Sequence, residues 1–317
     1  MNDLRGIRIG FFGTPDFALE SLKVLKDNFA QIEFVATQSP KPSGRGQKVN
    51  FSVVHRWSKK NNINVIIPKN MKERDFFSRI EQKKLDFIIV VAYGSLLSEK
   101  ILNLPKYMSL NVHASLLPRW RGAAPIQRSI INGDQITGVS IMKVDKELDA
   151  GPVILKRKVR ILSNDNSGKI HNKLSNLGAH LLIDAIKKIC SGKYSFENQD
   201  SSKVTYAKKI KKIETKINWE NSADHNQKII RAFNPWPGAW TYMNQKKRFR
   251  IKILESEIVE SSSSDFKNAK PGFCNDSLLV KCNDKLIQIK KIQKEGKKPM
   301  TSSEFINGYK PASCLLD

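Results

Sequence analysis

An asparagine and a histidine two residues apart are the side chains of this sequence best suited to chemistry at a carbonyl group. Asn111 carries an amide that can donate hydrogen bonds to an oxygen as it becomes negative. His113 carries the side chain whose unperturbed pKa lies nearest to neutral pH. A reaction at a carbonyl carbon needs a donor for the oxygen and a group that moves protons. The pair therefore predicts an active site.

A third candidate is an aspartate further along the chain. Asp149 stands just before Gly151 and Pro152, two residues that favour a loop with a fixed path. A carboxylate beside an imidazole holds the ring's orientation and favours its charged form. On its own, an aspartate in such a loop is more often an ordinary turn residue. Only its combination with Asn111 and His113 makes it a catalytic candidate.

These residues need a scaffold, and the first half of the chain predicts one. Short apolar runs alternate with helix-like stretches, a pattern typical of β-α-β units and a mainly parallel sheet. The pair at 111 and 113 falls at the end of one expected strand, so both side chains should share one face. We expect strands at residues 8–12, 32–37, 65–67, 87–92 and 109–113, and helices at residues 17–26, 51–60, 72–83 and 124–131. Two later strands follow at residues 138–144 and 153–161, and either a parallel or an antiparallel direction fits them. A long amphipathic helix is expected at residues 167–190.

The character of the chain changes after residue 192, where a polar, lysine-rich stretch without clear periodicity begins. Beyond it, one helix-like segment is followed by short strands between Gly, Asn and Ser clusters, which favours a small β-barrel or sandwich. The helix is expected at residues 222–233, and the strands at 239–243, 249–258, 277–281 and 286–292. We therefore expect an α/β catalytic domain at residues 1–193, a basic linker at 194–213 and a small β-barrel domain at 214–317.

Composition limits the class of protein and points to an anionic partner. The chain has 55 Lys and Arg against 30 Asp and Glu, a formal net charge of +25. Such an excess favours nucleic acid, although compositional drift toward Lys, Asn and Ile is the alternative. No apolar run approaches the roughly 20 residues that span a bilayer, and we expect a cytoplasmic protein. The four cysteines lack metal-ligand spacing, so no metal is expected.

Several short runs around the candidate residues resemble the signature of the 10-formyltetrahydrofolate-dependent formyltransferases. They are NVH at 111–113, SLLP at 115–118, RGAAPI at 121–126 and LDAGP at 148–152. Further runs are similar to the members of that family that act on initiator methionyl-tRNA. These are FGTPDF at 12–17, QSPKPSGRGQ at 38–47 and RAFNPWPGAW at 231–240. All of them occur in the order that the family has.

The resemblance implies a Rossmann-like formyltransferase domain followed by an OB-like barrel that binds tRNA. It also implies a reaction of translation initiation, in which the α-amine of methionine on initiator methionyl-tRNA takes the formyl group of 10-formyltetrahydrofolate. Asn111 and His113 would bind the oxygen of the tetrahedral intermediate, and His113 and Asp149 would handle the protons. Arg45 would contact the tRNA. A loop would border the folate, consisting of Ser115, Leu116, Leu117 and Pro118. No metal and no protein partner are implied, and a monomer is expected.

Three alternatives remain open from the sequence. The same donor could serve a nucleotide amino-sugar or a small amine such as a glycinamide ribotide, and the catalytic residues do not discriminate these acceptors. The basic loop at 40–48 and the lysine-rich stretch favour tRNA, because a small acceptor needs no extended cationic surface. An RNA-binding protein on an inactive scaffold is disfavoured because all three candidate residues are present. A dinucleotide-binding protein is disfavoured because residues 13–16 lack the G-x-G-x-x-G pattern.

Overall fold

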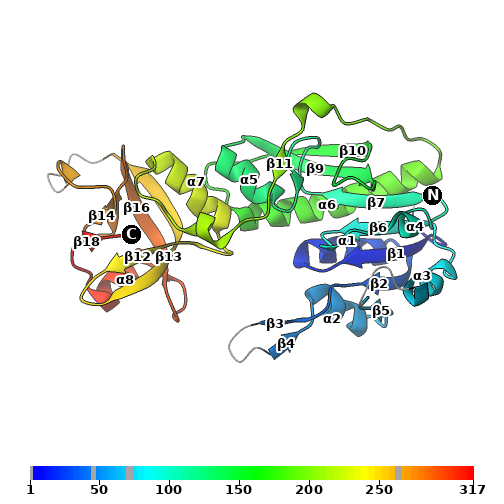
Figure 1. Cartoon of the computed structure of the whole chain (residues 1–317), viewed down its shortest axis with the longest axis horizontal. Helices are drawn as coiled ribbons and strands as arrows, with labels where there is room; N and C mark the ends of the chain where they lie inside the picture. The colour runs from blue at the N-terminus through cyan, green and yellow to red at the C-terminus, as the bar shows by residue number, and fades with distance from the viewer. Residues whose placement is uncertain (1–2, 44–47, 69–73, 261–265) are drawn as a thin grey trace. The chain divides into compact units, whose positions relative to one another are not determined.

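The structure is a computed structural model that describes residues 3–43, 48–68, 74–260 and 266–317 (Figure 1). The chain divides into two compact units. Unit 1 comprises Met1–Pro125, Ile136–Arg160 and His171–Ala207. Unit 2 comprises Ile126–Gln135, Ile161–Ile170 and Lys208–Asp317.

Unit 1 is organised around a mixed sheet with the strand order β10-β9-β7-β6-β1-β2-β5 (Figure 1). Strands β1, β2, β5, β6 and β7 are parallel. Beyond β7, strand β9 pairs antiparallel with β7, and β10 pairs antiparallel with β9. The sheet therefore confirms the expected α/β class with mainly parallel strands. The strand bounds are β1 Arg8–Gly13, β2 Gln31–Ala36, β5 Val65–Ile66, β6 Phe87–Val91, β7 Met108–His113, β9 Ile136–Lys143 and β10 Val153–Arg160.

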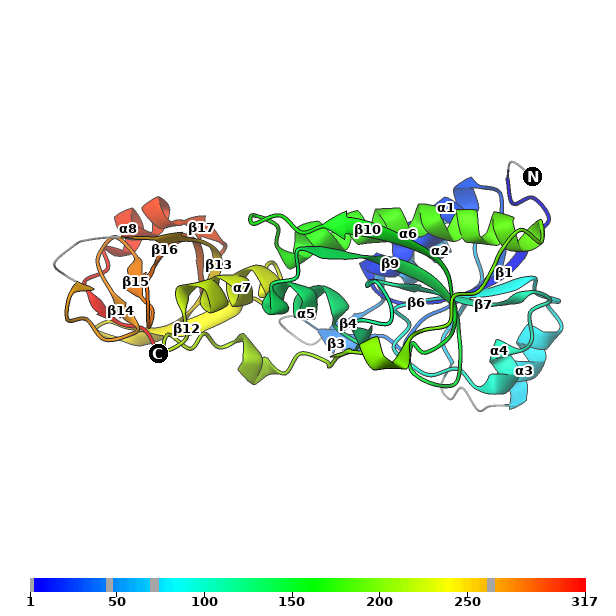
Figure 2. The same cartoon turned by 90° about the horizontal axis from the view of Figure 1, so that it is seen from above.

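Helices cover both faces of this sheet, α1 and α6 on one and α3 and α4 on the other (Figure 2). On the first face, the Ser175 hydroxyl of α6 donates to the main-chain oxygen of Phe17 in α1 at 3.1 Å. On the second, Phe12 of β1 packs edge-on against Phe34 and Phe76 in a buried apolar cluster. The helix bounds are α1 Asp16–Asp27, α2 Val53–Lys60, α3 Arg74–Glu81, α4 Glu99–Leu102 and α6 Ser167–Cys190. Helix α5, Pro125–Asn132, falls in unit 2 except for its first residue.

Helix α6 approaches the strand that carries the candidate pair very closely. A Cβ atom added at Gly178 would lie 2.7 Å from a methyl carbon of Val112 in β7, so only glycine permits this approach. The helix expected at residues 167–190 has those bounds in the structure. Its long apolar stripe therefore lies against the sheet, as an amphipathic helix should.

The structure contains elements that the sequence patterns did not predict. Within the expected 40–48 loop, β3 (Lys41–Ser43) and β4 (Lys48–Asn50) pair as an antiparallel ladder. Within the lysine-rich stretch, β11 (Tyr206–Ala207) pairs in parallel with β8 (Arg121–Gly122). These strands are two or three residues long, too short to show a periodicity in the sequence.

Unit 2 contains an antiparallel sheet with the strand order β12-β13-β16-β15-β14-β18, which nearly closes into a barrel (Figure 1). Tyr242 of β12 and Asp317 exchange two main-chain hydrogen bonds, of 2.8 and 3.1 Å, and so join the two ends of the sheet. This confirms the expected barrel-like fold. The bounds are α7 Ala223–Phe233, β12 Ala239–Asn244, β13 Arg248–Val259, β14 Phe273–Cys274, β15 Leu279–Lys281, β16 Leu286–Lys294, β17 Met300–Thr301, α8 Ser302–Tyr309 and β18 Cys314–Leu315. Helix α8 and strands β14, β17 and β18 were not predicted.

The four cysteines are free thiols. Burial raises the pKa of the Cys282 thiol to about 11 and also raises the pKa of Cys274. Thiols of this kind stay protonated and unreactive near neutral pH. Among the described helices, none has the length and apolar character needed to cross a membrane.

Candidate active site

The candidate pair lies at the carboxyl end of β7, where ligands of parallel sheets commonly bind. Asn111 is opposite Met142 of the antiparallel neighbour β9, and His113 is opposite Ser140. His113 is the last residue of the strand, and its side chain is 7% exposed, whereas Asn111 is half-buried. The two are separated by one residue in a regular strand, so their side chains leave on the same face.

The imidazole of His113 is held through one of its nitrogens. Nε2 lies 2.9 Å from the main-chain oxygen of Trp120, and a carbonyl oxygen can only accept, so Nε2 carries the hydrogen and donates it. Nδ1 lies 3.6 Å from Oδ2 of Asp149. The main-chain contact therefore occupies Nε2 and leaves Nδ1 facing the Asp149 carboxylate.

Asp149 comes from the turn between β9 and β10 and is held by its side chain. Its Oδ2 accepts the main-chain N–H of Gly122 at 2.7 Å, which aims the carboxylate toward His113. Its φ of 51° lies in the left-handed region, which is uncommon for residues other than glycine, although aspartate adopts it more often than most. Two residues later, a Cβ at Gly151 would lie 1.9 Å from the Lys143 oxygen, so only glycine fits.

One residue at this turn was missed by the sequence analysis. The side-chain amide nitrogen of Gln199 donates to the main-chain oxygens of Asp149 and Gly151, at 2.8 and 2.7 Å. Its oxygen accepts from Nε of Arg121 at 2.9 Å. Gln199 lies in the lysine-rich stretch, where no pattern marked it, and its partners on the turn are main-chain atoms that a sequence cannot display.

The expected folate-border loop follows directly after the pair and is fixed by hydrogen bonds. The Ser115 hydroxyl donates to the Arg119 oxygen at 2.6 Å. Ser140 of β9 accepts from the Leu117 main chain at 3.1 Å and donates to the Ser115 oxygen at 2.8 Å. Ser115 and Leu117 are buried, so Leu116 and Pro118, both half-buried, are the members with surface available to a ligand.

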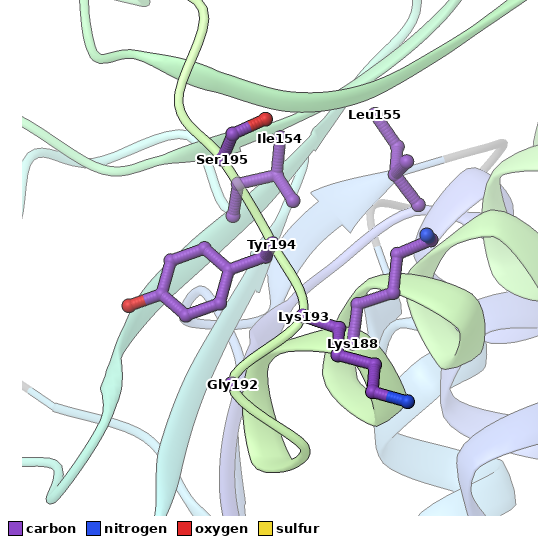
Figure 3. Close-up of a pocket in the computed structure, with 7 residues that line it drawn as sticks. All are labelled: Ile154, Leu155, Lys188, Gly192, Lys193, Tyr194 and Ser195. Atoms are coloured by element: carbon purple, nitrogen blue, oxygen red, sulfur yellow. The ribbon is translucent and has the colours of Figure 1, made fainter.

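Two further predictions concern Arg45 and a metal site. Arg45 is outside the described residues, between the paired strands β3 and β4. Among the described residues, no group of three or more His, Cys, Asp or Glu side chains is placed to hold a metal ion. Figure 3 shows a pocket of unit 1 that none of the predicted site residues lines. It is formed by Ile154, Leu155, Lys188, Gly192, Lys193, Tyr194 and Ser195.

Two family models match the chain. The model described as formyl transferase matches residues 7–186. The model described as formyl transferase, C-terminal domain, matches residues 209–310. The first match includes Asn111, His113 and Asp149, and the second includes most of the barrel strands.

Solved structures share the fold at low sequence identity. HypX from Aquifex aeolicus, in complex with tetrahydrofolic acid, has a TM-score of 0.65 at 14% identity, covering 95% of this chain and 47% of that chain. The N-formyltransferase from Helicobacter canadensis, in complex with folinic acid and dTDP-3-aminofucose, has a TM-score of 0.64 at 20% identity. That match covers 89% of this chain and 99% of the other.

Curated relatives match over nearly the full length of both proteins. The methionyl-tRNA formyltransferase of Thermodesulfovibrio yellowstonii is 40% identical over 303 residues, covering 95% of this chain and 95% of the relative. The methionyl-tRNA formyltransferase of Sulfurihydrogenibium sp. is 42% identical over 310 residues, covering 96% of this chain and 97% of the relative. With this identity across both units, and with the site residues in place on the sheet, the chain belongs to the methionyl-tRNA formyltransferase family.

Proposed function

We propose that this chain transfers the formyl group of 10-formyltetrahydrofolate to the α-amino group of methionine on initiator methionyl-tRNA. The observation that carries the proposal is the 40–42% identity to methionyl-tRNA formyltransferases across both units. The contact between His113 Nδ1 and Asp149 supports it, because acyl transfer to an amine needs a positioned proton acceptor.

The chemistry divides among the residues of β7 and the Asp149 turn. The amine attacks the formyl carbon, a C–N bond forms, and the carbonyl electrons move onto oxygen. We assign Asn111 and His113 to that oxygen, where a preorganised donor is worth about 3 kcal/mol. His113 Nδ1 takes the proton released by the attacking nitrogen, and the charged ring then donates to the oxyanion. As the carbonyl re-forms, the C–N bond to the folate breaks and the proton passes from Nδ1 to the folate nitrogen. Asp149 keeps the ring turned toward the reacting groups.

The donor supplies the one-carbon unit already activated, so the protein has to bind and polarise it. The half-buried Leu116 and Pro118 offer apolar surface next to His113 in the chain, which suits a flat aromatic ring. We assign the folate edge to the loop of residues 115–118 on that basis.

A cationic face of the barrel supports tRNA as the acceptor. On β12, Trp240 and Tyr242 are half-buried while their neighbours Ala239, Thr241 and Met243 are buried, so both point outward. Their partners on β13 are Lys252 and Arg250, and the next outward pair brings Arg248. These three cations and three nearby lysines form what we call the cationic face. It consists of Lys216, Lys246, Lys247, Arg248, Arg250 and Lys252.

Aromatic rings lie against the two arginines of this face. The Arg248 guanidinium carbon lies 4.0 Å from the ring centre of Tyr242, and that of Arg250 lies 5.6 Å from the ring centre of Trp240. Carboxylates also contact the arginines, Asp317 at Arg248 and Glu295 at Arg250, but exposed pairs of this kind contribute little. Alternate residues on a strand are about 6.8 Å apart, which suits successive phosphates along an RNA strand.

We also assign Arg45 to tRNA binding, on the resemblance of its loop alone. A small acceptor such as a nucleotide amino-sugar would use neither this arginine nor a row of ordered cations on the barrel. The two kinds of acceptor therefore separate in a direct assay.

The test is an acceptor comparison with the purified full chain. The protein is incubated with 10-formyltetrahydrofolate and either initiator methionyl-tRNA or a nucleotide amino-sugar, and the formylated amine is identified by mass spectrometry. We expect formylmethionine on the tRNA and no formylated sugar. Formylation of the sugar alone would overturn the proposal, and a His113→Ala variant controls for non-enzymatic transfer.

A further inference from the structure

We propose that Gln199 is a positioning residue for formyl transfer, which holds the Asp149 turn so that its carboxylate stays at His113. The inference rests on the proposed function, since it concerns that reaction, but it assigns a task to a residue outside the motifs that resemble the family. Gln199 reaches the site from the segment after α6, the beginning of which Figure 3 shows at residues 192–195.

The hydrogen bonds of Gln199 fit a glutamine specifically. Its amide nitrogen has two hydrogens, and these go to the main-chain oxygens of Asp149 and Gly151. Its amide oxygen accepts from Arg121. The reverse orientation would set the amide nitrogen against a guanidinium, which only donates, so the assignment of the two amide atoms is unambiguous. Neither glutamate nor an apolar side chain can supply both donors.

These bonds complete a ring of contacts around the candidate acid-base pair. Trp120 accepts from His113, and the following Arg121 is 9% exposed and donates to Gln199. Gln199 holds the main chain of Asp149, whose carboxylate returns to His113. The glutamine therefore joins the strand-end segment that fixes the imidazole to the turn that fixes the carboxylate.

The segment around Gln199 otherwise lies on the surface. Every described residue from 191 to 203 is exposed except Gln199, which is half-buried. The segment is tied down on each side, by two main-chain bonds between Val153 and Glu197 at 2.9 and 2.8 Å and by the pairing of β11 with β8. Because this segment is held on both sides of Gln199 and only Gln199 is half-buried within it, the glutamine side chain can reach the active site.

Gln199 matters to the rate because it holds the main chain of Asp149 in a left-handed conformation, which most residues adopt uncommonly. The left-handed φ of 51° persists only while neighbouring contacts over-determine the turn. Without the two bonds from Gln199, the turn keeps the Gly122 bond to its carboxylate and the main-chain bond from Ala150 to Glu147, but the main-chain oxygens of Asp149 and Gly151 lose their side-chain donor. A displacement of about 1 Å in a catalytic group lowers the rate by about 100-fold.

The experiment compares Gln199→Met and Gln199→Glu with wild type and with Asn198→Ala, an exposed neighbour that serves as the matched control. The single-turnover rate of formyl transfer is measured with enzyme in excess, because that rate does not depend on the fraction of enzyme that is active. Binding of methionyl-tRNA and urea unfolding are measured on the same preparations.

We expect both Gln199 variants to transfer about 100-fold more slowly, with tRNA binding within about twofold of wild type, and Asn198→Ala to behave as wild type. A single-turnover rate close to wild type in either folded variant overturns the inference. Loss of tRNA binding with an unchanged rate at saturation also overturns it, because it would make Gln199 a binding residue. Failure of the wild-type protein to formylate methionyl-tRNA would instead overturn the proposed function.

Discussion

At the scale of residues, the proposed chemistry depends on one nitrogen of the His113 imidazole. His113 donates through Nε2 to Trp120, and this leaves Nδ1 to face Asp149. The two partners come from different segments, so the ring cannot rotate without leaving both. The same geometry predicts what happens when either member of the pair is replaced.

We expect His113→Ala to reduce formyl transfer by about 10²-fold or more, because it removes both a proton acceptor and an oxyanion donor. Asp149→Asn should cause a loss of similar order, since a neutral amide does not stabilise the charged ring. The binding of methionyl-tRNA should change by less than about threefold, as measured by filter binding.

Matched controls are available for both changes. His180 is an exposed histidine on α6, and Asp145 is an exposed aspartate in the same loop as Asp149. His180→Ala and Asp145→Asn should turn over as wild type does. Wild-type turnover in His113→Ala or Asp149→Asn would contradict the assigned roles.

The sequence predicts the residues of this cluster unevenly. Asn111 and His113 were identified because a spacing of two in a strand places both on one face, and the structure has that strand. Asp149 needed the glycine and proline after it to mark a turn. Gln199 had no such marker, because a side chain that bonds to main-chain oxygens leaves no complementary side chain in the sequence.

At the scale of elements, an ion pair links the first residue of α1 to α6 near its N-terminal end. His171 Nε2 lies 3.3 Å from Asp16 Oδ1. The hydrogen bond between them raises the pKa of His171 and lowers the pKa of Asp16, and partial burial opposes both shifts. His171 also contacts the Asn172 amide oxygen at 3.1 Å and the edge of the Phe17 ring.

This pair should make stability depend on pH. A histidine with a raised folded-state pKa contributes stability that is fully present below its unfolded value of 6.5 and is lost as pH rises through the folded value. Asp16 contributes above its ordinary value of 3.8 and loses its contribution as pH falls through its lowered value. The pair therefore stabilises most between these limits.

We expect the difference in unfolding free energy between wild type and His171→Asn to shrink from about pH 6 to about pH 9. Urea denaturation at the two pH values measures it. Asp16→Asn should flatten the same pH dependence, because it removes the partner. A difference that grows with pH would contradict the assignment.

Elements in which a regular apolar periodicity continues over many residues were the most predictable. Helix α6 matches its expected range because an apolar stripe was sustained over its whole length. Helix α8 was missed, although Thr301 and Glu304 form a capping box that the sequence displays three residues apart. The β3–β4 pair was missed for a different reason. Each strand is three residues long, too short to show the alternation that marks a strand, and β3 also contains Pro42.

At the scale of the whole molecule, the net charge of +25 predicted an anionic partner but not its place of contact. Residues 246–252 show the cations in the sequence, yet the face they form depends on the register of β12 with β13. That register sets Tyr242 opposite Arg250 and Asn244 opposite Arg248. Pairing between strands, which no local pattern specifies, turns a run of cations into an ordered surface.

The cationic face leads to a prediction about salt. Arg248→Glu combined with Arg250→Glu should weaken tRNA binding and lower the slope of log affinity against log salt by about 2, because each arginine neutralises about one phosphate. Filter binding over a range of salt concentrations measures the slope. The single-turnover rate at saturating enzyme should stay near that of wild type.

A control with the same change in charge is Lys267→Glu combined with Lys270→Glu, at exposed lysines outside the face. This variant should weaken binding less and leave the slope near that of wild type. Equal slopes for the two double variants would show that net charge alone, and not the ordered face, determines tRNA binding.

The ring through His113, Trp120, Arg121, Gln199 and Asp149 has a consequence for synthesis on the ribosome. Its members come from three distant stretches of chain, and the last of them follows the long helix α6. A nascent chain that has emerged only through Asp149 holds the three proposed reacting groups without the amide that joins them. Catalytic competence should therefore arise late in translation, only after the segment around Gln199 has emerged and closed onto the sheet.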